Sequence, residues 1–466
     1  MPSEKTPEDF GFHEVSTVSI EKHYGPPEIG DEWRKLLHVI RSQDISLDMR
    51  EENMFPSNVP LFNFFAGFHH ARTDGHIPPP GIARGVSSDR SEALSKAFGE
   101  FLERYPLLLY RKEDLLLASP RQLRDKGHAH LDPRTIAGFN DEQCTWFPNR
   151  SFSENSVFGW VSGASAMRRG KVLVPAQLVF WNYCKDYDSY LEPHIRGVNT
   201  NGAGGFFTEE GALLSGIYEL VQRDSFLIYW LNNKAPPRID ASATANHDLK
   251  KLLEASEREG LAVTFLDTTS DLGIPSVACA TVTENKDEPH IVYGGGCDFN
   301  AEAALLRALE ECLGVRYWVK RYAPAYHLPP DYVPFRTTGI VQANRLGFWK
   351  HFRGPGALTF FSGPQISLTE FQKRARKFAS KREELRGLVR IFKARGSEYE
   401  IFFYRAEHPA LTRLGYESSR VIIPALVPLY LREEHATLGA KRLQDAPFRM
   451  GFQPSRAPNP LPHPFP

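Results

Sequence analysis

Apolar and polar residues follow two rhythms along this chain, and together they predict a mixture of strands and helices. Short runs rich in Val, Leu and aromatic residues are typical of strands, and they lie at 171–181, 261–267, 276–283 and 290–295. Other stretches repeat an apolar residue every three or four positions, which is the spacing of an amphipathic helix. The order strand, glycine-containing segment, helix recurs. This recurrence predicts the α+β class, with a mixed α/β arrangement as the alternative.

The pattern continues into the C-terminal third. Residues 367–390 are basic and predict a helix, and the runs at 389–394 and 399–405 predict a strand pair. The segment RVIIPALVPLYL at 420–431 predicts a strand, a turn and a second strand. The stretch GHIPPPG at 75–81 is a plausible boundary, because consecutive prolines disfavour both helix and sheet. We therefore divide the chain into an accessory region (1–78), a main domain (79–450) and a proline-rich tail (451–466).

Three stretches repeat one pattern: Gly, seven residues, Ala-Leu, five residues, Glu. The residues are Gly85, Ala93, Leu94 and Glu100; Gly204, Ala212, Leu213 and Glu219; and Gly296, Ala304, Leu305 and Glu311. Each Gly lies in a turn-rich segment, and each Glu lies on a predicted amphipathic helix. The pattern predicts three glycine loops at helix N-termini, where backbone N–H groups can approach phosphates.

Charged residues follow a second regularity on these helices. Glu100, Glu103 and Arg104 are spaced i, i+3, i+4 and share a helix face, as do Glu219, Gln222 and Arg223. On the third helix, Arg307 and Glu311 are one turn apart. Carboxylates can hold Mg²⁺, and arginines bind phosphate in a bidentate way, so the set suits a polyphosphate held by metal ions. For one helix alone, a solvent-facing surface with i, i+4 ion pairs is the simpler interpretation.

Composition excludes several classes of protein. Lys+Arg and Asp+Glu number 56 each in 466 residues, so the charge balance does not point to nucleic acid or an anionic membrane as a main partner. The acidic start MPSEKTPEDF is not a signal peptide, and no apolar run approaches the roughly 20 residues that span a bilayer. The five cysteines are scattered without a Cys-x-x-Cys pair. We expect a soluble cytoplasmic protein.

Taken together, the motifs resemble those of the YcaO family of ATP-dependent enzymes, over roughly residues 80–450. GIARGVSSDRSEALSKAFGEFLERY (81–105) resembles the family's Gly-Lys-Gly loop and Glu-x-x-Glu-Arg helix. VNTNGAGGFFTEEGALLSGIYELVQRD resembles its Asn-x-Asn-Gly segment and Glu-Leu-x-Glu-Arg-Asp helix, and the Arg-Ala-Leu-x-Glu helix and the late proline segment also have counterparts. No single motif would be specific, but the linked set is.

The resemblance implies a YcaO-like fold around a nucleotide site, with ATP and Mg²⁺. Metal binding is implied for Glu100, Glu103, Glu219 and Glu311. Nucleotide binding is implied for Arg84, Ser95, Glu100, Arg104, Asn201, Glu210, Gln222, Arg307 and Glu311. Catalytic roles are implied for Arg223, Arg307 and Pro466.

The last nine residues, PNPLPHPFP, alternate proline up to the chain end, and such a segment prefers polyproline II. Alternating prolines at the C-terminus resemble the azoline-forming cyclodehydratases of the family, which cyclise Cys, Ser or Thr of a ribosomal precursor peptide onto the preceding amide. The resemblance implies that the Pro466 carboxylate lies near the active site and acts as a base. The implied partners are the precursor, an E1-like leader-binding protein and an FMN-dependent azoline dehydrogenase. A homodimer or a larger complex is also implied, with neither nucleic acid nor membrane as a partner.

The sequence departs from the family pattern at Arg84, Lys96, Gly211, Gln222 and Gly314. Arg84 stands for the loop lysine and Lys96 for the helix serine. Gly211 and Gln222 each replace an acid of the second helix, and Gly314 replaces the glutamine of the third. Three functions are weighed: the cyclodehydratase, a related enzyme that forms a thioamide or an amidine, and a non-catalytic scaffold subunit. The proline tail favours the cyclodehydratase, and the departures favour the scaffold.

Overall fold

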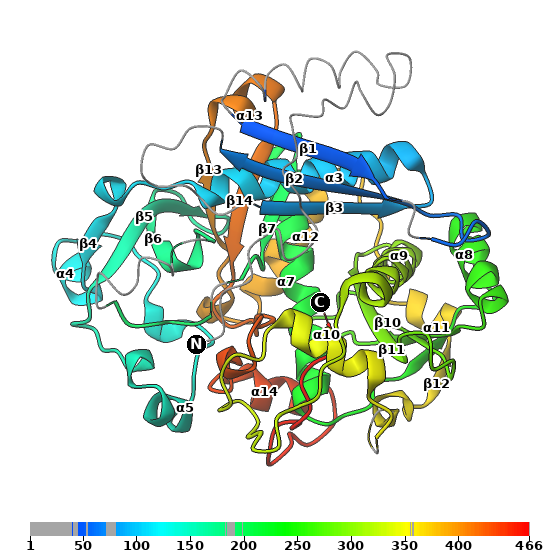
Figure 1. Ribbon diagram of the computed structural model, residues 1–466. Coiled ribbons are helices and arrows are strands. Elements are labelled where there is room, and N and C mark those ends of the chain that lie inside the picture. The colour runs from blue at the N-terminus through cyan, green and yellow to red at the C-terminus, as the bar shows by residue number, and fades with distance from the viewer. Residues whose placement is uncertain are drawn as a thin grey trace.

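The computed structural model describes residues 40, 45–52, 55–70, 81–181, 183, 192–197, 199–354, 356 and 358–465. Within these residues the strands form three sheets (Figure 1). A three-stranded antiparallel sheet has the order β1-β2-β3, and a five-stranded sheet has the order β11-β10-β9-β8-β12. The third sheet has the order β4-β5-β13-β14-β7, with β6 pairing to β5. The mixture of helices and sheets confirms the predicted α+β class.

The strands are antiparallel to their neighbours except for β8 and β12, which pair in parallel. Their bounds are β1 Ile45–Glu51, β2 Phe62–His70, β3 Gly81–Ser87, β4 Leu116–Ala118, β5 Phe158–Ser165, β6 Val172–Pro175, β7 Ala203–Phe206, β8 Arg238–Asp240, β9 Ala262–Asp267, β10 Ser276–Val282, β11 Ile291–Cys297, β12 Gln365–Ser367, β13 Phe402–Ala406 and β14 Glu417–Ile422.

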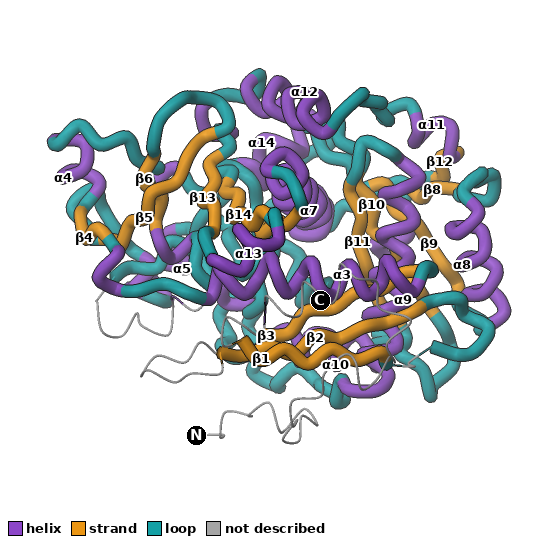
Figure 2. Tube along the Cα trace, turned by 90° about the horizontal axis from the view of Figure 1, so that it is seen from above, coloured by secondary structure: helices purple, strands orange, loops and turns teal. Residues whose placement is uncertain are grey.

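Three long helices, one from each repeat, lie between the sheets (Figures 1 and 2). They are α3 Arg90–Arg104, α7 Glu209–Leu231 and α9 Ala301–Tyr322. The shorter helices are α4 Pro120–Asp125, α5 Asp141–Trp146, α8 His247–Arg258, α10 Gln342–His351, α11 Leu368–Gln372, α12 Lys381–Lys393, α13 Pro409–Leu414 and α14 Arg442–Arg449. Helix α7 is buried on nearly all sides, because sheets, α12 and α14 pack around it. No helix in the described ranges combines the length and apolarity needed to cross a membrane.

Several predicted elements are present and others are wrong. The runs at 261–267, 276–283 and 290–295 form β9, β10 and β11. The predicted helix at 367–390 is interrupted, since α11 ends at Gln372 and α12 begins at Lys381. The predicted strand at 389–394 is the end of α12, where Leu388 and Phe392 are buried one turn apart. The predicted second strand of 420–431 is absent, and the long run at 171–181 keeps only β6, because Pro175 is followed by a 3-10 turn.

The three repeat glycines lie in strands, which corrects the prediction of glycine loops at helix N-termini. Gly85, Gly204 and Gly296 belong to β3, β7 and β11. A Cβ added at these positions would lie 1.9, 2.1 and 2.1 Å from the backbone oxygen of the repeat alanine on the following helix. The glycine therefore lets each strand pack directly on its helix backbone. The shared spacing encodes a packing contact that occurs three times.

Each helix also begins at the same offset from its glycine. Asp89, Thr208 and Asn300 each stand four residues after the repeat glycine and cap the helix. In all three, the side-chain oxygen accepts the N–H three residues further on, which satisfies a backbone group that the helix leaves unpaired. The repeats are thus one structural unit used three times.

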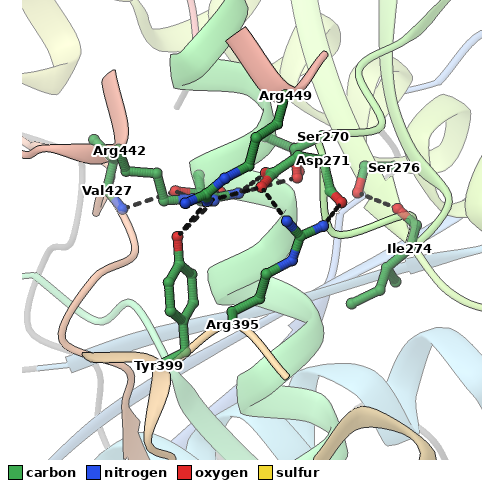
Figure 3. Close-up of polar contacts among 11 residues, drawn as sticks. Ser270, Asp271, Ile274, Ser276, Arg395, Tyr399, Val427, Arg442 and Arg449 are labelled. Atoms are coloured by element: carbon green, nitrogen blue, oxygen red, sulfur yellow. Dashed lines mark hydrogen bonds and ion pairs between the residues drawn. The ribbon is translucent and has the colours of Figure 1, made fainter. Parts of the chain in front are cut away.

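A buried ion-pair cluster fixes α14 against α7 (Figure 3). Nε of Arg442 lies 2.8 Å from both oxygens of Asp224 on α7, and its Nη2 lies 2.8 Å from Asp271. Tyr399 accepts a hydrogen bond from Nη1 of Arg442 at 3.1 Å, and Arg395 also pairs with Asp271. Because α14 precedes the C-terminal tail, the cluster fixes the point from which the tail returns to the centre.

Strands β1 and β2, which lie in the region that we assigned as accessory, form one sheet with β3 of the first repeat: β1 pairs with β2, and β2 pairs with β3. Phe64, Ala66 and Phe68 of β2 pack with Phe98 and Phe101 of α3. The division at residue 78 lies in a stretch outside the described residues, and it remains a prediction.

Candidate active site

The repeat glutamates have the same local environment in all three units. Oε2 of Glu100 accepts the N–H of Arg84 at 2.5 Å, Oε2 of Glu219 accepts that of Gly202 at 2.7 Å, and Oε2 of Glu311 accepts that of Gly295 at 2.5 Å. Each carboxylate is therefore tied to the backbone of its own repeat, within the strand for Glu100 and Glu311 and one residue before β7 for Glu219. Its position follows from the close packing of that strand on the helix.

Two of these glutamates also pair with the arginine one turn further along the helix. Arg104 lies 2.5 Å from Oε1 of Glu100, and Arg223 lies 2.7 Å from Oε1 of Glu219. Nε of each arginine is buried without a hydrogen-bond partner in the described part of the chain. Glu311 has no such arginine, because the corresponding position is Val315.

The glutamates of different repeats act on one another electrostatically. Burial and the neighbouring Glu219 carboxylate raise the pKa of Glu103 to about 8, although Arg104 opposes the shift. Burial also raises the pKa of Glu311, with the Gly295 N–H and Arg223 acting against it and Glu219 adding to it. The carboxylates of Glu100, Glu103, Glu219 and Glu311, carried by α3, α7 and α9, thus act on one another electrostatically, and we call these four residues the acidic cluster.

This cluster has the chemistry of a divalent-cation site. Crowded carboxylates with raised pKa values are stabilised by a bound cation, and Mg²⁺ prefers carboxylate and phosphate oxygens. Within the described ranges, no three His, Cys, Asp or Glu side chains already stand in a metal-binding group. The predicted metal roles of the four glutamates therefore remain predictions.

The other predicted ligands divide into those near the cluster and those apart from it. Asn201 is fully buried and donates to Leu429 O at 2.6 Å, whereas its Oδ1 has no partner among the described residues. Arg307 is half exposed and pairs with Asp298 at 2.9 Å. Glu210 pairs with Arg382 of α12 at 3.0 Å, and Ser95 is exposed on α3. The structure pairs Arg307 and Glu210 with residues outside the acidic cluster and leaves Ser95 exposed.

Two of the departures from the family pattern contact each other. The Arg84 guanidinium donates to Gly314 O at 2.5 Å and to Asn63 Oδ1 at 2.7 Å. A Cβ on Gly314 would lie 3.0 Å from Arg84 Nη2 and 2.9 Å from Val86 Cγ2. Burial lowers the pKa of Arg84 to about 10, while Glu100 opposes the shift. The large cation of Arg84 on β3 therefore occupies the space that the absent side chain of Gly314 on α9 leaves.

The remaining departures also have local explanations. Lys96 pairs with Glu310 of α9 at 2.8 Å and so links two repeats. Gly211 leaves room for the ring of Phe206, which a Cβ would approach to 2.3 Å. The Gln222 amide packs on Gly295, where an added Cβ would lie 2.0 Å from Nε2. These three residues therefore each fit the packing between elements of the repeats.

The C-terminal tail is buried beside the cluster. Trp349 of α10 donates to Pro462 O at 2.9 Å, and His463 Nε2 lies 2.8 Å from Tyr430 O. The Phe465 ring lies 4.3 Å from that of Phe226 on α7, and a Cβ on Gly295 would lie 2.8 Å from it. Gly295 is the residue whose N–H binds Glu311. The tail enters the middle of the molecule (Figure 1), and Pro466 itself lies outside the described residues.

Sequence reasoning missed two buried arginines. Arg420 of β14 donates to Leu178 O at 3.0 Å and to Asn199 O at 2.6 Å, and it interacts with Glu219 and Glu103. Arg196 is 4% exposed, and the charge of Arg420 acts on it. Arg420 is the first residue of the RVIIPALVPLYL motif, so its position offered a signal. Arg196 offered none, since it lies in an irregular segment before the Asn-x-Asn motif.

The fold and this site define an α+β protein whose three equivalent strand–helix units converge on carboxylates and arginines. The family described as "YcaO cyclodehydratase, ATP- and Mg²⁺-binding" matches residues 84–427. The chain belongs to the YcaO family, as the motifs predicted. It is accordingly an ATP-dependent enzyme that binds ATP and Mg²⁺.

Individual relatives agree with this assignment. An uncharacterized protein of Methanothermobacter thermautotrophicus is 26% identical over 78% of this chain and 85% of its own length. A heterocyclase solved with substrate and cofactor has a TM-score of 0.70 and 18% identity, covering 92% of this chain and 57% of its own. The YcaO protein of Methanopyrus kandleri, bound with AMPPCP and Mg²⁺, has a TM-score of 0.58 and 20% identity, covering 85% and 89%. This chain thus spans little more than half of the first of these structures. At these identities the two structures show a shared fold.

Proposed function

We propose that this protein is an ATP-dependent peptide cyclodehydratase that converts Cys, Ser or Thr of a ribosomally made precursor peptide to an azoline. The observation that carries the proposal is the convergence of the acidic cluster, its arginines and the buried C-terminal tail at one place. The fold shared with a heterocyclase solved with its substrate supports the same reaction. The product would belong to the thiazole- and oxazole-modified peptides, among which bacteriocins of the microcin type are found.

The reaction joins the side-chain Sγ or Oγ to the carbonyl carbon of the preceding amide. A neutral amide oxygen is a poor leaving group, and ATP supplies the phosphoryl group that lets this oxygen leave as phosphate. The thiol or hydroxyl proton and the amide N–H proton are both lost as the C=N bond forms. Peptide and ATP therefore give azoline, ADP and phosphate, and the peptide loses the elements of one water.

The residues would divide this work. Glu100, Glu219 and Glu311 would hold Mg²⁺ with Glu103, because their carboxylates converge from three helices. Arg104 and Arg223 each keep a buried Nε–H unpaired among the described residues, and both would contact phosphate oxygens.

The Asn201 side chain would contact the nucleotide through its free Oδ1. Of the remaining predicted ligands, Arg307 stands apart with Asp298, so its catalytic role requires it to leave that ion pair.

The Pro466 carboxylate would accept one of the protons. Phe465 fixes the end of the tail against α7 and β11, which leaves one residue to reach the acidic cluster. An E1-like partner would present the leader peptide, and an FMN-dependent dehydrogenase would oxidise the azoline. The protein would act as a homodimer or within a larger complex with these partners. We propose a cytoplasmic location, where precursor and ATP are available.

The main test is a mass spectrum of a candidate precursor after reaction with the protein, its E1-like partner, ATP and Mg²⁺. The expected result is the loss of one water mass per modified residue, abolished by Glu219→Gln. A product in which sulfur has replaced an oxygen would instead establish a thioamide-forming enzyme. No mass change together with no ATP turnover would support the scaffold interpretation and overturn the proposal.

The terminal carboxylate needs a milder test than removal of the whole tail. Deleting residues 461–466 would also remove the buried His463 and Phe465 side chains and disturb the fold. Deleting Pro466 alone, or adding one glycine after it, moves the carboxylate and keeps the Phe465 contact. Cyclisation should fall at least about tenfold, because general base catalysis is typically worth more than that, while nucleotide affinity stays unchanged. Unchanged cyclisation would eliminate this carboxylate as the base.

A further inference from the structure

Two buried arginines, Arg196 and Arg420, interact electrostatically with each other, and Arg420 also interacts with the acidic cluster. Arg196 is 4% exposed, and its Nη2 has no hydrogen-bond partner in the described part of the chain. The other charge acting on it is that of Arg420, which is also 4% exposed. Burial, with Arg420 adding to it, lowers the pKa of Arg196 to about 9. Burying one cation close to another costs free energy, so this pair requires a compensating interaction.

The fold holds Arg196 in place at that cost. The N–H of His194 donates to Asn149 O at 2.8 Å, and that of Ile195 donates to Gln177 Oε1 at 2.8 Å. The following Gly197 packs on the ring of His435, which an added Cβ would approach to 2.5 Å. The backbone on both sides of Arg196 is therefore anchored, which fixes the position from which its side chain extends.

Arg420 connects this pair to the site. Its hydrogen bonds go to the backbone carbonyls of Leu178 and Asn199 and to the Asn199 side chain, which are neutral acceptors. The charges acting on it are the carboxylates of Glu219 and Glu103, which favour its cationic form, and Arg223, which opposes it. Arg420, in β14 of the six-stranded sheet, therefore interacts electrostatically with both the acidic cluster and Arg196.

We propose that Arg196 and Arg420 form a phosphoryl-binding site that stands opposite the acidic cluster. An arginine fork binds phosphate oxygens in a bidentate way, and a dianion would compensate both buried cations at once. The inference rests on the proposed function, in which the γ-phosphoryl group moves to the amide oxygen and then leaves as phosphate. Neither arginine belongs to a repeat helix, whereas Arg104 and Arg223 do, and the Arg223 charge also acts on Arg420.

The direct test measures the binding of inorganic phosphate to the full chain, without nucleotide or peptide, by calorimetry at constant ionic strength. Arg196→Gln should weaken phosphate binding at least about tenfold, as expected for loss of a charged hydrogen bond, and Arg196→Lys should weaken it less. Arg316→Gln is the matched control, because Arg316 is equally buried but donates to the carbonyls of Thr281 and Pro289. The control should retain phosphate affinity even if it is less stable.

The unfolding midpoint is a second measurement, and it distinguishes a phosphate-binding arginine from a structural one. Arg196→Gln removes an uncompensated buried charge, so its unfolding midpoint should equal or exceed that of the wild type. A lower midpoint with unchanged phosphate affinity would show a structural role and overturn the inference. Failure of the wild-type protein to bind phosphate in these conditions would overturn it as well.

Two further measurements distinguish whether the site binds the γ-phosphoryl group of the nucleotide or the released phosphate. If the site receives the γ-phosphoryl of the bound nucleotide, Arg196→Gln will weaken AMPPCP binding and leave ADP binding unchanged. If it receives the released phosphate, the variant will weaken phosphate inhibition of ATP turnover and leave AMPPCP binding unchanged. Phosphate binding is measured without peptide, so its result does not depend on cyclisation. Loss of phosphate binding with cyclisation intact would overturn only the phosphoryl-binding site. Phosphate binding without cyclisation would overturn only the cyclodehydratase proposal.

Discussion

The repeat glycines make a sharp prediction about stability. In Gly204→Ala, the new Cβ would lie 2.1 Å from Ala212 O and 2.7 Å from Gly216 N, both of which are backbone atoms of α7. Ordinary contact begins at 3.4 Å, so β7 and α7 would have to separate by about 1.3 Å, the difference between these distances. Neither neighbour can rotate away, unlike a flexible side chain.

The cost follows from two terms. Overpacking a rigid interior typically costs about 1–3 kcal/mol, and a backbone contact on both sides places this site at the upper end. The separation would also stretch the 2.7 Å hydrogen bond from Gly202 N–H to Glu219, worth about another 1.5 kcal/mol for a charged acceptor. We expect Gly204→Ala to lose about 3 kcal/mol or more, and Gly85→Ala and Gly296→Ala to behave alike.

The assay compares unfolding midpoints in denaturant for Gly204→Ala and for Gly67→Ala. Gly67 is the matched control, because it is also a strand glycine, in β2, and no atom lies within 4 Å of its added Cβ. The control should stay within about 0.5–1 kcal/mol of the wild type. Equal midpoints for the two variants would refute the conclusion that the repeat spacing encodes strand–helix contact. Nucleotide affinity of Gly204→Ala should also fall, since its strand positions Glu219.

Three further changes test other parts of the structure by the same unfolding assay. Gly314→Gln should be destabilising alone and largely rescued by Arg84→Lys, with a coupling of about 1 kcal/mol or more between these contacting residues; additive costs would show that they do not compensate each other. Asp224→Asn should cost about 3 kcal/mol, because it leaves the buried Arg442 with one carboxylate fewer, and a cost near zero would contradict the role of the cluster in Figure 3. Burial, with Arg150 adding to it, lowers the pKa of His435 to about 3, so the folded state resists its protonation. The neutral His435 side chain makes its full contribution to the free energy of unfolding above pH 6.5. Below that pH the free energy of unfolding falls toward pH 3, by about 2 kcal/mol at pH 5. His435→Gln should remove this part of the pH dependence.

The local features of the repeats could be predicted because they depend on neighbours in the chain. The glycine-to-glutamate spacing, the amphipathic stripes and strands such as β9 and β10 are all visible as periodic patterns. Where a pattern was ambiguous, burial decided the outcome, as at 389–394. There the apolar residues suit either a strand or one helix face, and the core beside α7 favours the helix.

The linked motifs also determined the family, because they combine in one order along the chain. They did not reveal what the departures do. Arg84 and Gly314 are separated by 230 residues, and their contact depends on β3 lying against α9. Residue type alone suggested a phosphate ligand at Arg84, whereas in the structure its guanidinium donates to Gly314 O and Asn63.

The sequence by itself thus determined the three units, their carboxylates and the family. Only the tertiary structure decided that the repeat glycines are strand residues, that the charge of Arg420 acts on Arg196, and that the tail is buried with Phe465 against Phe226. The physical reason is that helix and strand patterns record contacts between residues close in the chain. A site assembled from α3, α7, α9, β14 and the C-terminus depends on long-range packing, and each of its contacts leaves no periodic trace in the sequence.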